Sequence, residues 1–521
     1  MRYVKVPSQI HSSELRSTDA VLSPGRYVRF IPPSSSKSVE YIQLDKLVNV
    51  AEGTVKINNA VKYRYAEIGS IDVETGGVRF DTRGGYQVSA KRAQPVSKGN
   101  VLISTVRTYR KGIGLVADEY PGVEPSDEAP PMVASGAILI LSSMRDEFNS
   151  LSLSYVYSFL RSDFFVEQVW SLLNRGVYPR MDTGALERIL IPVSKDPLTV
   201  GWICFLTEQI SLKEKLIRER DIEILRQISV ELRTEEKSTG FFYKFPNSSD
   251  LRSTGRLDAA IYSETLKSSM WLIEDYEHGS ETPDCAGFTI KPGPSLEIKL
   301  LKTRIDSDEP RPGFYTLIIP ANITEYGTIG KLSWLGTAKK LPILQSGDIL
   351  FGEAGFGKGR TAVLVNPPAQ ATTNAHGLVI RHQNKDRKLS IFFRCILHWY
   401  RSRGLIDLLA VGGSGGHFSP EYFKSLLIPK FPVEIQDSIV RLYSNSLSDV
   451  TDPNKSITDL NELSRFHEHR NKDAGIVELA ADMEEMKQHL ADAHEYVLQG
   501  QEAVIPPKIT GQNLDLASWS R

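Results

Sequence analysis

Two segments of this sequence line up with each other, GVYPRMDTGALERILIP from Gly176 to Pro192 and GSGGHFSPEYFKSLLIP from Gly413 to Pro429. A second pair of segments reads SSELRST at Ser12–Thr18 and SSDLRST at Ser248–Thr254, and it has nearly the same spacing along the chain. Repeats at one spacing indicate duplicated structural units, so the sequence predicts two similar halves in tandem, each of roughly 200 residues.

The two halves share an order of predicted elements. GNVLISTVRTYRKGIGLV from Gly99 corresponds in pattern, with an insertion, to GDILFGEAGFGKGRTAVLV from Gly347. Both halves contain short apolar strands, such as Val101–Val106 and Ile349–Gly352, which are broken by Gly, Pro and Asn turns. A polar helix follows each Ile-Pro corner. The pattern therefore predicts a globular region and then a helix, twice over.

The predicted helices carry apolar stripes between highly charged residues. In the first half the stripe contains Ile203, Leu206, Ile210, Ile217 and Ile224. In the second half Val433–Leu447 starts similarly, Pro453 ends or bends the helix, and a further stripe includes Ile476, Met483 and Leu490. Near-heptad spacing is typical of helices that pair with another helix, and it also occurs in ordinary core helices.

These patterns divide the chain into seven predicted segments. They are an N-terminal extension (1–35), a first globular domain (36–195), a first spacer helix (196–236), a lead-in to the second repeat (237–290), a second globular domain (291–432), a second helical region broken near Pro453 (433–500), and a C-terminal tail (501–521).

Composition describes an ordinary soluble chain. It has 521 residues, of which 41% are hydrophobic and 24% charged, with a formal net charge of -1. The three cysteines lack C-x-x-C spacing, so neither a zinc site nor a disulfide framework is indicated. The first residues lack the order of a signal peptide, and no apolar run approaches the roughly 20 residues of a membrane span. A cytoplasmic location is expected.

Two short motifs point to enzymes. Gly352, Gly357 and Lys358 have the spacing of a phosphate-binding loop, but Gly359 stands where Ser or Thr should ligate magnesium. The sequence NPPA at Asn366–Ala369 resembles the N-P-P-aromatic motif of adenine methyltransferases, but Ala369 cannot stack on a base. Both segments are better explained as loops that leave strands.

Two windows of the sequence contain no acidic residue. One runs from Thr82 to Ala117 and the other from Ala354 to Lys385, and both are rich in Lys and Arg. Such windows predict local positive patches. Lys and Arg neutralise phosphates, and the Arg fork also reads guanine edges in the major groove. Either window alone could be an ordinary solvent-exposed surface. The two windows occupy corresponding positions in the two halves of the repeat, however, and this favours nucleic-acid binding.

The order of motifs resembles that of the specificity (S) subunit of type I restriction–modification enzymes. The resemblance covers residues 36 to 447, and its motifs include YAEIGSIDVETGGV (65–78), KGNVLISTVR (98–107), GRLDAAIYS (255–263), SGDILFGEAGFGKG (346–359) and GGSGGHFSPEYFKSLLIPKFPVEIQDSI (412–439), besides the repeated segment at 176–192. The chain departs from the family in its first 35 residues, in the charged region after Pro453 and in its tail.

The resemblance implies an α/β (α+β) fold with two similar target recognition domains, separated by long helices that pair as an antiparallel coiled coil. It implies a non-catalytic subunit that reads a bipartite double-stranded DNA target. The implied partners are adenine methyltransferase subunits, a restriction/translocase subunit and other defence proteins, with no membrane. S-adenosylmethionine is expected in the partner methyltransferase, and no cofactor or metal in this chain.

The resemblance assigns base reading to loops. In the first half the candidate DNA-binding residues are Arg83, Lys91, Arg92, Arg107, Tyr109, Arg110, Lys111, Arg175, Tyr178 and Arg180. In the second half they are Phe356, Lys358, Arg360, Ser414, His417 and Ser419. The apolar stripes supply the candidate partner-binding residues Ile203, Leu206, Ile210, Ile217, Ile224, Ile476, Met483 and Leu490.

Two other classes of protein remain open at this point. One is an enzyme, either a nucleoside triphosphatase using Gly352–Lys358 or a methyltransferase using Asn366–Ala369. The other is a scaffold whose coiled coil joins proteins without touching DNA.

Overall fold

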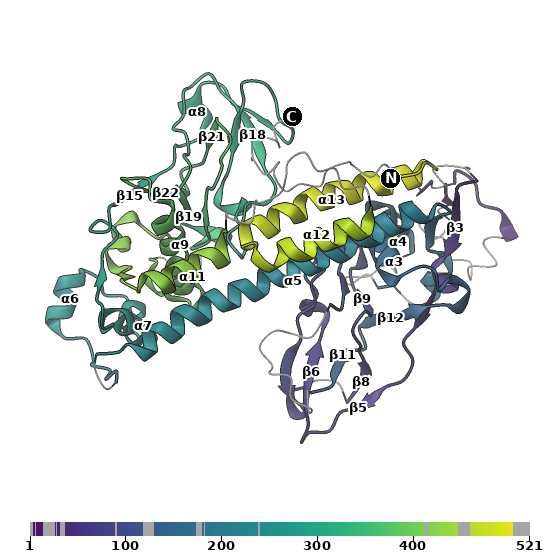
Figure 1. Ribbon diagram of the computed structural model, residues 1–521, viewed down its shortest axis with the longest axis horizontal. Helices are drawn as coiled ribbons and strands as arrows, with labels where there is room; N and C mark the ends of the chain where they lie inside the picture. The colour runs from purple at the N-terminus through teal and green to yellow at the C-terminus, as the bar shows by residue number, and fades with distance from the viewer. Residues whose placement is uncertain are drawn as a thin grey trace. The chain divides into compact units, whose positions relative to one another are not determined.

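The chain folds into two compact units (Figure 1). The computed structural model describes residues 4–5, 7–13, 27, 29–31, 37–88, 91–117, 130–172, 180–181, 183–237, 240–411, 416–445 and 459–503. Unit 1 contains the described residues up to 215 together with 459–469 and 483–503, and unit 2 contains those in 216–445 and 470–482. Both units combine sheets and helices, which confirms the predicted fold class.

Unit 1 contains two main sheets. The first has the strand order β10–β9–β12–β4, with bounds Ile113–Leu115, Val101–Ser104, Ile138–Met144 and Val48–Val50. The second has the order β5–β8–β11–β6–β7, with bounds Val55–Lys56, Arg92–Pro95, Met132–Ala134, Lys62–Ala66 and Asp81–Gly84. Within them β11 and β6 are parallel, and the other pairs are antiparallel. Two further pairs are β3 (Val39–Gln43) with β13 (Leu190–Ser194), and β1 (Val4–Lys5) with β2 (Arg29–Phe30).

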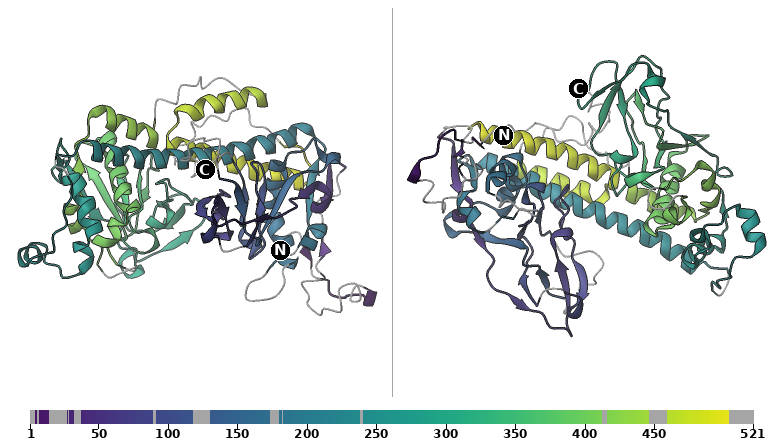
Figure 2. Two further views of the ribbon diagram at one scale, coloured as in Figure 1. Left: turned by 90° about the horizontal axis from the view of Figure 1, so that it is seen from below. Right: turned by 180° about the vertical axis from the view of Figure 1, so that it is seen from behind.

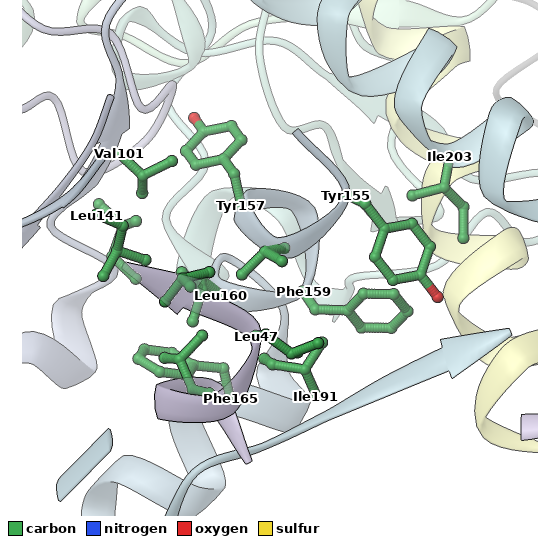
Figure 3. Packing of buried hydrophobic residues seen from close by; sticks show 14 of the residues in the cluster. Leu47, Val101, Leu141, Tyr155, Tyr157, Phe159, Leu160, Phe165, Ile191 and Ile203 are labelled. Carbon is green, nitrogen blue, oxygen red and sulfur yellow. The ribbon is translucent and has the colours of Figure 1, made fainter. Parts of the chain in front are cut away.

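The central strand β9 is buried on both faces. Val101 and Ile103 belong to a large core with helical residues such as Tyr155 and Ile203, whereas Leu102 belongs to a separate core with Ile140. Figure 3 shows the first of these cores, with Val101, Leu141 and Tyr155 from its strands and helices. Alternate side chains of a strand point to opposite faces, so a run of apolar residues without polar alternation is what a strand between two cores requires.

Unit 2 repeats the strand order of the first sheet, and in its second sheet it repeats the order around the parallel pair. Its first sheet is β15–β22–β19–β20, with bounds Phe288–Pro292, Gly377–His382, Ile349–Gly352 and Thr361–Val363. Its second is β16–β18–β17–β21, with bounds Ile305–Ser307, Ser333–Gly336, Tyr315–Leu317 and Ala371–Thr372, where β17 and β21 are parallel. The pair β14 (Ser280–Glu281) and β23 (Ile428–Pro429) corresponds to β3 and β13. The duplication predicted from the sequence is therefore present in the strand order.

Helices follow the strands in the same sequence in both units. Unit 1 has α2 (Leu44–Leu47), α3 (Leu153–Leu160) and α4 (Asp163–Leu172). Unit 2 has α6 (Ser248–Thr254), α7 (Glu264–Glu274), α8 (Ile298–Leu301), α9 (Arg387–Ser402), α10 (Leu405–Leu409) and α11 (Val433–Tyr443). In each unit a two-helix segment, α3–α4 or α9–α10, follows the long strand of the first sheet.

The long helix α5 runs from Pro197 to Thr234, close to the predicted bounds 196–236. Its start is fixed by Asp196, whose carboxylate accepts hydrogen bonds from the backbone N–H groups of Leu198 and Thr199. Hydrogen bonding, chiefly from the Thr199 hydroxyl, lowers the pKa of Asp196. A proline in the first turn is also suited to a helix start, because the first N–H groups have no partner inside the helix.

The second helical region is not one helix. After α11 it continues as α12 (Leu460–Asp473) and α13 (Ile476–Leu498), which form a hairpin (Figure 2). Gly475 lies in the turn, where a Cβ would be 2.7 Å from the backbone nitrogen of Ser444. The predicted break at Pro453 lies outside the described residues, as does the tail from 504 onward.

In unit 1, α13 runs antiparallel to α5. The backbone N–H of Ala503 donates to the Thr199 hydroxyl at 2.9 Å, and the ring of Trp202 lies 6.3 Å from that of His489. Antiparallel pairing of long helices is thus confirmed, with α13 as the partner of α5 instead of a continuous second helix.

The apolar stripes are buried within the chain. Ile203, Leu206, Ile217, Ile224, Ile476 and Met483 are buried, and Ile210 and Leu490 are partly buried against the unit 1 core. These side chains fill the chain's own cores, so they are not a surface open to another subunit, and their assignment as partner-binding residues is corrected accordingly. Among the described residues, no helix is both long and apolar enough to span a membrane.

Candidate nucleic-acid interface

The same hairpin loop occurs in both units. In unit 1 it joins β9 to β10 (residues 105–112), and in unit 2 it joins β19 to β20 (residues 353–360). The backbone N–H of Ser104 donates to Gly112 O at 2.8 Å, and that of Gly352 donates to Arg360 O at 2.9 Å. We name these segments loop 1 and loop 2.

The two loops also turn at equivalent positions. Arg107 and Lys111 have φ angles of 51° and 59° in loop 1, while Gly355 and Gly359 have φ angles of 67° and 73° in loop 2. Positive φ suits glycine and is strained for other residues. The two glycines of loop 2 therefore allow the same backbone conformation that loop 1 adopts with Arg107 and Lys111 at the equivalent positions.

This geometry contradicts a phosphate-binding role for loop 2. A phosphate loop leads from a strand into the N-terminus of a helix, whose N–H groups hold the phosphate. Loop 2 instead returns directly into the antiparallel strand β20, after a short turn at Gly355–Gly357. Gly352 is needed because a Cβ there would lie 1.9 Å from Gly357 O. Asn366–Ala369 lies between β20 and β21, as a loop leaving a strand.

A second chain segment reaches each loop. The backbone N–H of Met181 donates to Thr105 O at 2.8 Å in unit 1, and that of Phe418 donates to Glu353 O at 2.9 Å in unit 2. Arg180 and His417, one residue earlier, therefore occupy equivalent places beside the loops, and both are exposed. Arg175, Tyr178 and Ser414 belong to the same segments but lie outside the described residues.

Loop 1 presents cations and an aromatic pair. Arg110 is exposed, and within the part of the chain that the structure describes it forms no ion pair. Tyr109 stacks on Trp170 of α4, with ring centroids 4.2 Å apart, and Trp170 is 48% exposed. Arginine next to an exposed aromatic ring is suited to phosphates and to stacking on bases.

The end of α3 and the start of α4 hold loop 1 in place. The ammonium of Lys111 lies 2.7 Å from Asp163 at the start of α4. The guanidinium of Arg161 donates to the carbonyl oxygens of Lys111 and Ile113 at 3.2 and 2.9 Å. These contacts fix the backbone of the loop, so the Lys111 charge is partly neutralised while that of Arg110 remains available.

The other candidate cations of unit 1 lie on the second sheet. Arg83 on β7 pairs with Asp81 and Glu67 at 2.8 and 3.1 Å, and its hydrogen bond to Asp81 is the main cause of its raised pKa. Arg83 is therefore an ion-paired cation, and its assignment to DNA binding stays a prediction. Lys91 and Arg92 are exposed at the start of β8.

Unit 2 differs, because two cations of its acid-free window, Lys358 and Arg381, are paired with acidic residues. Lys358 is 6% exposed and lies 2.8 Å from Asp407 of α10, and Arg360 donates to Ile323 O at 2.8 Å. Arg381 forms two 2.6 Å bonds to Asp348, whose hydrogen bond raises the pKa of Arg381. The positive charge expected around loop 2 is therefore partly neutralised at Lys358 and Arg381, while the assignment of Lys358 and Arg360 to DNA binding stays a prediction.

The remaining candidates of unit 2 lie near loop 2. Ser419 caps the short helix Pro420–Ser425 by accepting a hydrogen bond from the Glu421 N–H, which is a structural role. Phe356 lies in the turn of loop 2, and its side chain is outside the description. His417 is 60% exposed, and its Nδ1 lies 3.4 Å from Glu353 Oε1.

Three functional candidates escaped the sequence analysis. Trp170 stacks on Tyr109, and Glu353 and His376 lie beside His417. The sequence of α4 gave little signal for Trp170, because an apolar residue in an amphipathic helix is expected in the core and Trp170 is instead 48% exposed. Glu353 and His376 gave none, since their proximity depends on strand pairing between β19 and β22.

The chain is similar to chains of solved structures over most of its length. One belongs to a type I R-M system studied for complex assembly and conformational transition, with 15% identity, a TM-score of 0.30 and coverage of 89% of this chain and 98% of that one. The HsdS subunit from Thermoanaerobacter tengcongensis has 14% identity and a TM-score of 0.29, covering 89% and 97%. The S subunit of a type I restriction-modification system from M. genitalium has 13% identity and a TM-score of 0.39, covering 91% and 98%. No protein family matches the chain, and no curated protein does.

Proposed function

We propose that this chain is a non-catalytic DNA-recognition subunit that reads a bipartite target, with unit 1 and unit 2 each reading one half. The observation that carries the proposal is the duplicated loop: one backbone path occurs in both units but carries different side chains. Two domains that each read a different short DNA sequence require the same loop backbone with different side chains. The motif resemblance to S subunits supports the same function.

The charges of unit 1 favour DNA over a protein ligand. Arg110 and Arg180 are exposed on adjacent segments, and Trp170 offers an aromatic face beside them. Side chains of this kind contact phosphates and base edges. In unit 2 we assign the reading surface to His417 and loop 2, where polar contacts replace free positive charge.

Helix α5 suits a spacer between two reading heads. Its 38 residues measure about 57 Å at a rise of 1.5 Å per residue. One turn of duplex measures about 34 Å, so such a helix is long enough to span one turn.

We further propose that the helices dock adenine methyltransferase subunits, which bring S-adenosylmethionine and the methyl-transfer chemistry. In a restriction system a restriction/translocase subunit completes the complex. Since the apolar stripes are buried, docking falls to the outer face of α5, where Leu198 and Leu212 in unit 1 and Ile222 and Val230 in unit 2 are exposed.

Selection from a random duplex library tests DNA recognition. The full chain, alone and with its co-purified subunits, is expected to enrich two short half-sites separated by a constant unread spacer. Arg110→Ala should then weaken binding by about 1–3 kcal/mol and relax one half-site only. His417→Ala should affect the other half-site only.

Arg145→Ala is the matched control. Arg145 is exposed in unit 1 but follows β12 at the end opposite to Ser104 and loop 1. Its replacement should leave affinity and specificity unchanged. If neither the chain alone nor the chain with its co-purified subunits enriches a split sequence, the proposal is contradicted. If Arg110→Ala lowers the affinity for all sequences equally, Arg110 contacts phosphate and does not read a base.

A further inference from the structure

A cluster of metal-ligand residue types lies beside loop 2, which contributes one of its members. Glu353, His376 and His417 each offer one ligand atom, and these atoms all lie within 4.8 Å of one another. Glu353 is 20% exposed, and both histidines are exposed. We propose that these three residues bind a divalent transition-metal ion, with zinc as the best match, at the tip of unit 2.

The backbone positions all three residues. The N–H of Glu353 donates to His376 O at 3.0 Å, and the N–H of Phe418 donates to Glu353 O at 2.9 Å, which fixes His417 next to them. His417 also exchanges backbone hydrogen bonds with Val411, at 3.0 and 3.3 Å. His376 is held by Asn374, whose side-chain oxygen accepts from its N–H at 3.2 Å. These bonds fix the backbone positions from which the three ligand side chains extend.

The ligand set determines the class of metal. Two imidazoles and one carboxylate suit zinc and its neighbours, whereas magnesium and calcium prefer oxygen ligands only. Ligands at about 2.0–2.2 Å from a tetrahedral zinc lie about 3.4 Å apart. The His417 Nδ1–Glu353 Oε1 distance is already 3.4 Å, and the ring centroids of His376 and His417 are 6.2 Å apart. Small side-chain rotations therefore close the site around an ion.

Three protein ligands leave one coordination position open. Because both histidines are exposed, that position faces solvent, where it accepts a water molecule or an anionic oxygen. If the proposed function holds, a DNA phosphate is the anion that reaches it, and the metal supplies the positive charge that the paired Lys358 and Arg381 do not. The metal site itself does not depend on that function.

Unit 1 provides an internal contrast. Backbone hydrogen bonds equivalent to those of the cluster join Thr105 to Ala137 and Met181 to Thr105. The positions of Glu353, His376 and His417 are thus occupied by Thr105, Ala137 and Arg180, which form no metal site. Unit 1 has an arginine where unit 2 has a ligand, so the two tips obtain positive charge in different ways.

Titration of the metal-free full chain with cobalt(II) and zinc, without DNA, tests the site. The expected result is one tetrahedral cobalt site whose visible absorption zinc displaces. His376→Ala and His417→Ala should each weaken binding by at least about ten-fold, because even second-shell changes at metal sites cost 10–100-fold. Glu353→Gln should also weaken it while keeping the size of the side chain.

Two controls separate this site from other ligands. His278→Ala removes an exposed histidine of unit 2 outside the cluster, and Cys285→Ser removes an exposed thiol, so both should leave the titration unchanged. Absence of cobalt uptake, or uptake that survives His376→Ala, would overturn the proposal. DNA recognition is tested separately by the Arg110→Ala binding experiment. A negative result in the metal titration therefore does not affect the proposed DNA recognition, and a negative result in DNA binding does not affect the proposed metal site.

Discussion

Loop 1 and loop 2 follow one backbone path with opposite side-chain solutions. Loop 1 accepts two basic residues at positive φ, whereas loop 2 uses Gly355 and Gly359 there. Loop 1 keeps Arg110 exposed, whereas loop 2 pairs Lys358 with Asp407 and has a Glu–His–His cluster beside it. The comparison shows that main-chain hydrogen bonds hold the backbone of both loops in the same path. The side chains of the two loops can therefore differ without changing that path.

The helical parts of the two units also differ. In unit 1, His494 of α13 is buried against Phe159 and lies 3.0 Å from the Ser158 hydroxyl, and burial lowers its pKa to about 3. In unit 2, Arg470 of α12 forms a two-bond ion pair with Asp482 of α13, at 2.8 and 2.9 Å. Unit 1 therefore holds the helical hairpin with neutral groups, and unit 2 with buried charges.

The largest expected effect comes from breaking that buried pair. Asp482→Ala leaves the Arg470 guanidinium, 4% exposed, without its main partner, and should destabilise unit 2 by about 3–5 kcal/mol. Hydrogen exchange read peptide by peptide should show the loss in unit 2 first. Asp492→Ala, at an exposed position of α13, is the control and should change little. Unchanged protection in unit 2 would mean that the pair contributes nothing to its stability.

A smaller effect is expected from making the loops alike. Gly352→Ser introduces the residue that unit 1 has at Ser104, but its Cβ would meet Gly357 O at 1.9 Å. We expect a loss of about 1–3 kcal/mol from overpacking, measured by chemical denaturation. Ser104→Gly, the reciprocal change, has no such clash and should cost less. Equal losses from both variants would show that the two loops are not equivalent after all.

The smallest effect sharpens the comparison at the left-handed positions. Lys111→Gly removes strain of about 1–2 kcal/mol and an exposed ion pair worth about 0–1 kcal/mol, so stability should stay equal or rise slightly. Lys111→Ala keeps the strain and should be less stable than the glycine variant. Gly359→Lys adds strain in loop 2, because a Cβ there would lie 3.1 Å from Ile406 Cγ2. Thermal denaturation should therefore show a lower melting temperature for unit 2. A glycine variant no more stable than the alanine variant would contradict the strain argument.

Sequence patterns determined the parts that depend on local order. The duplication, the bounds of Ile349–Gly352 and the extent of α5 followed from repeats, apolar runs and heptad spacing, because burial imposes those periods on neighbouring residues. The candidates Arg110 and Arg180 were also selected from local sequence, and both are exposed, while their assignment to DNA binding stays a prediction.

Only the tertiary structure decided which charges stay available. Lys358 pairs with Asp407, and Arg83 pairs with Asp81 and with the more distant Glu67, because an acid-free window of sequence is not acid-free in space. Glu353, His376 and His417 likewise meet only because β19 pairs with β22 and a later segment returns to loop 2. Ion pairs and ligand clusters depend on which distant segments become neighbours, and that information is absent from any local pattern.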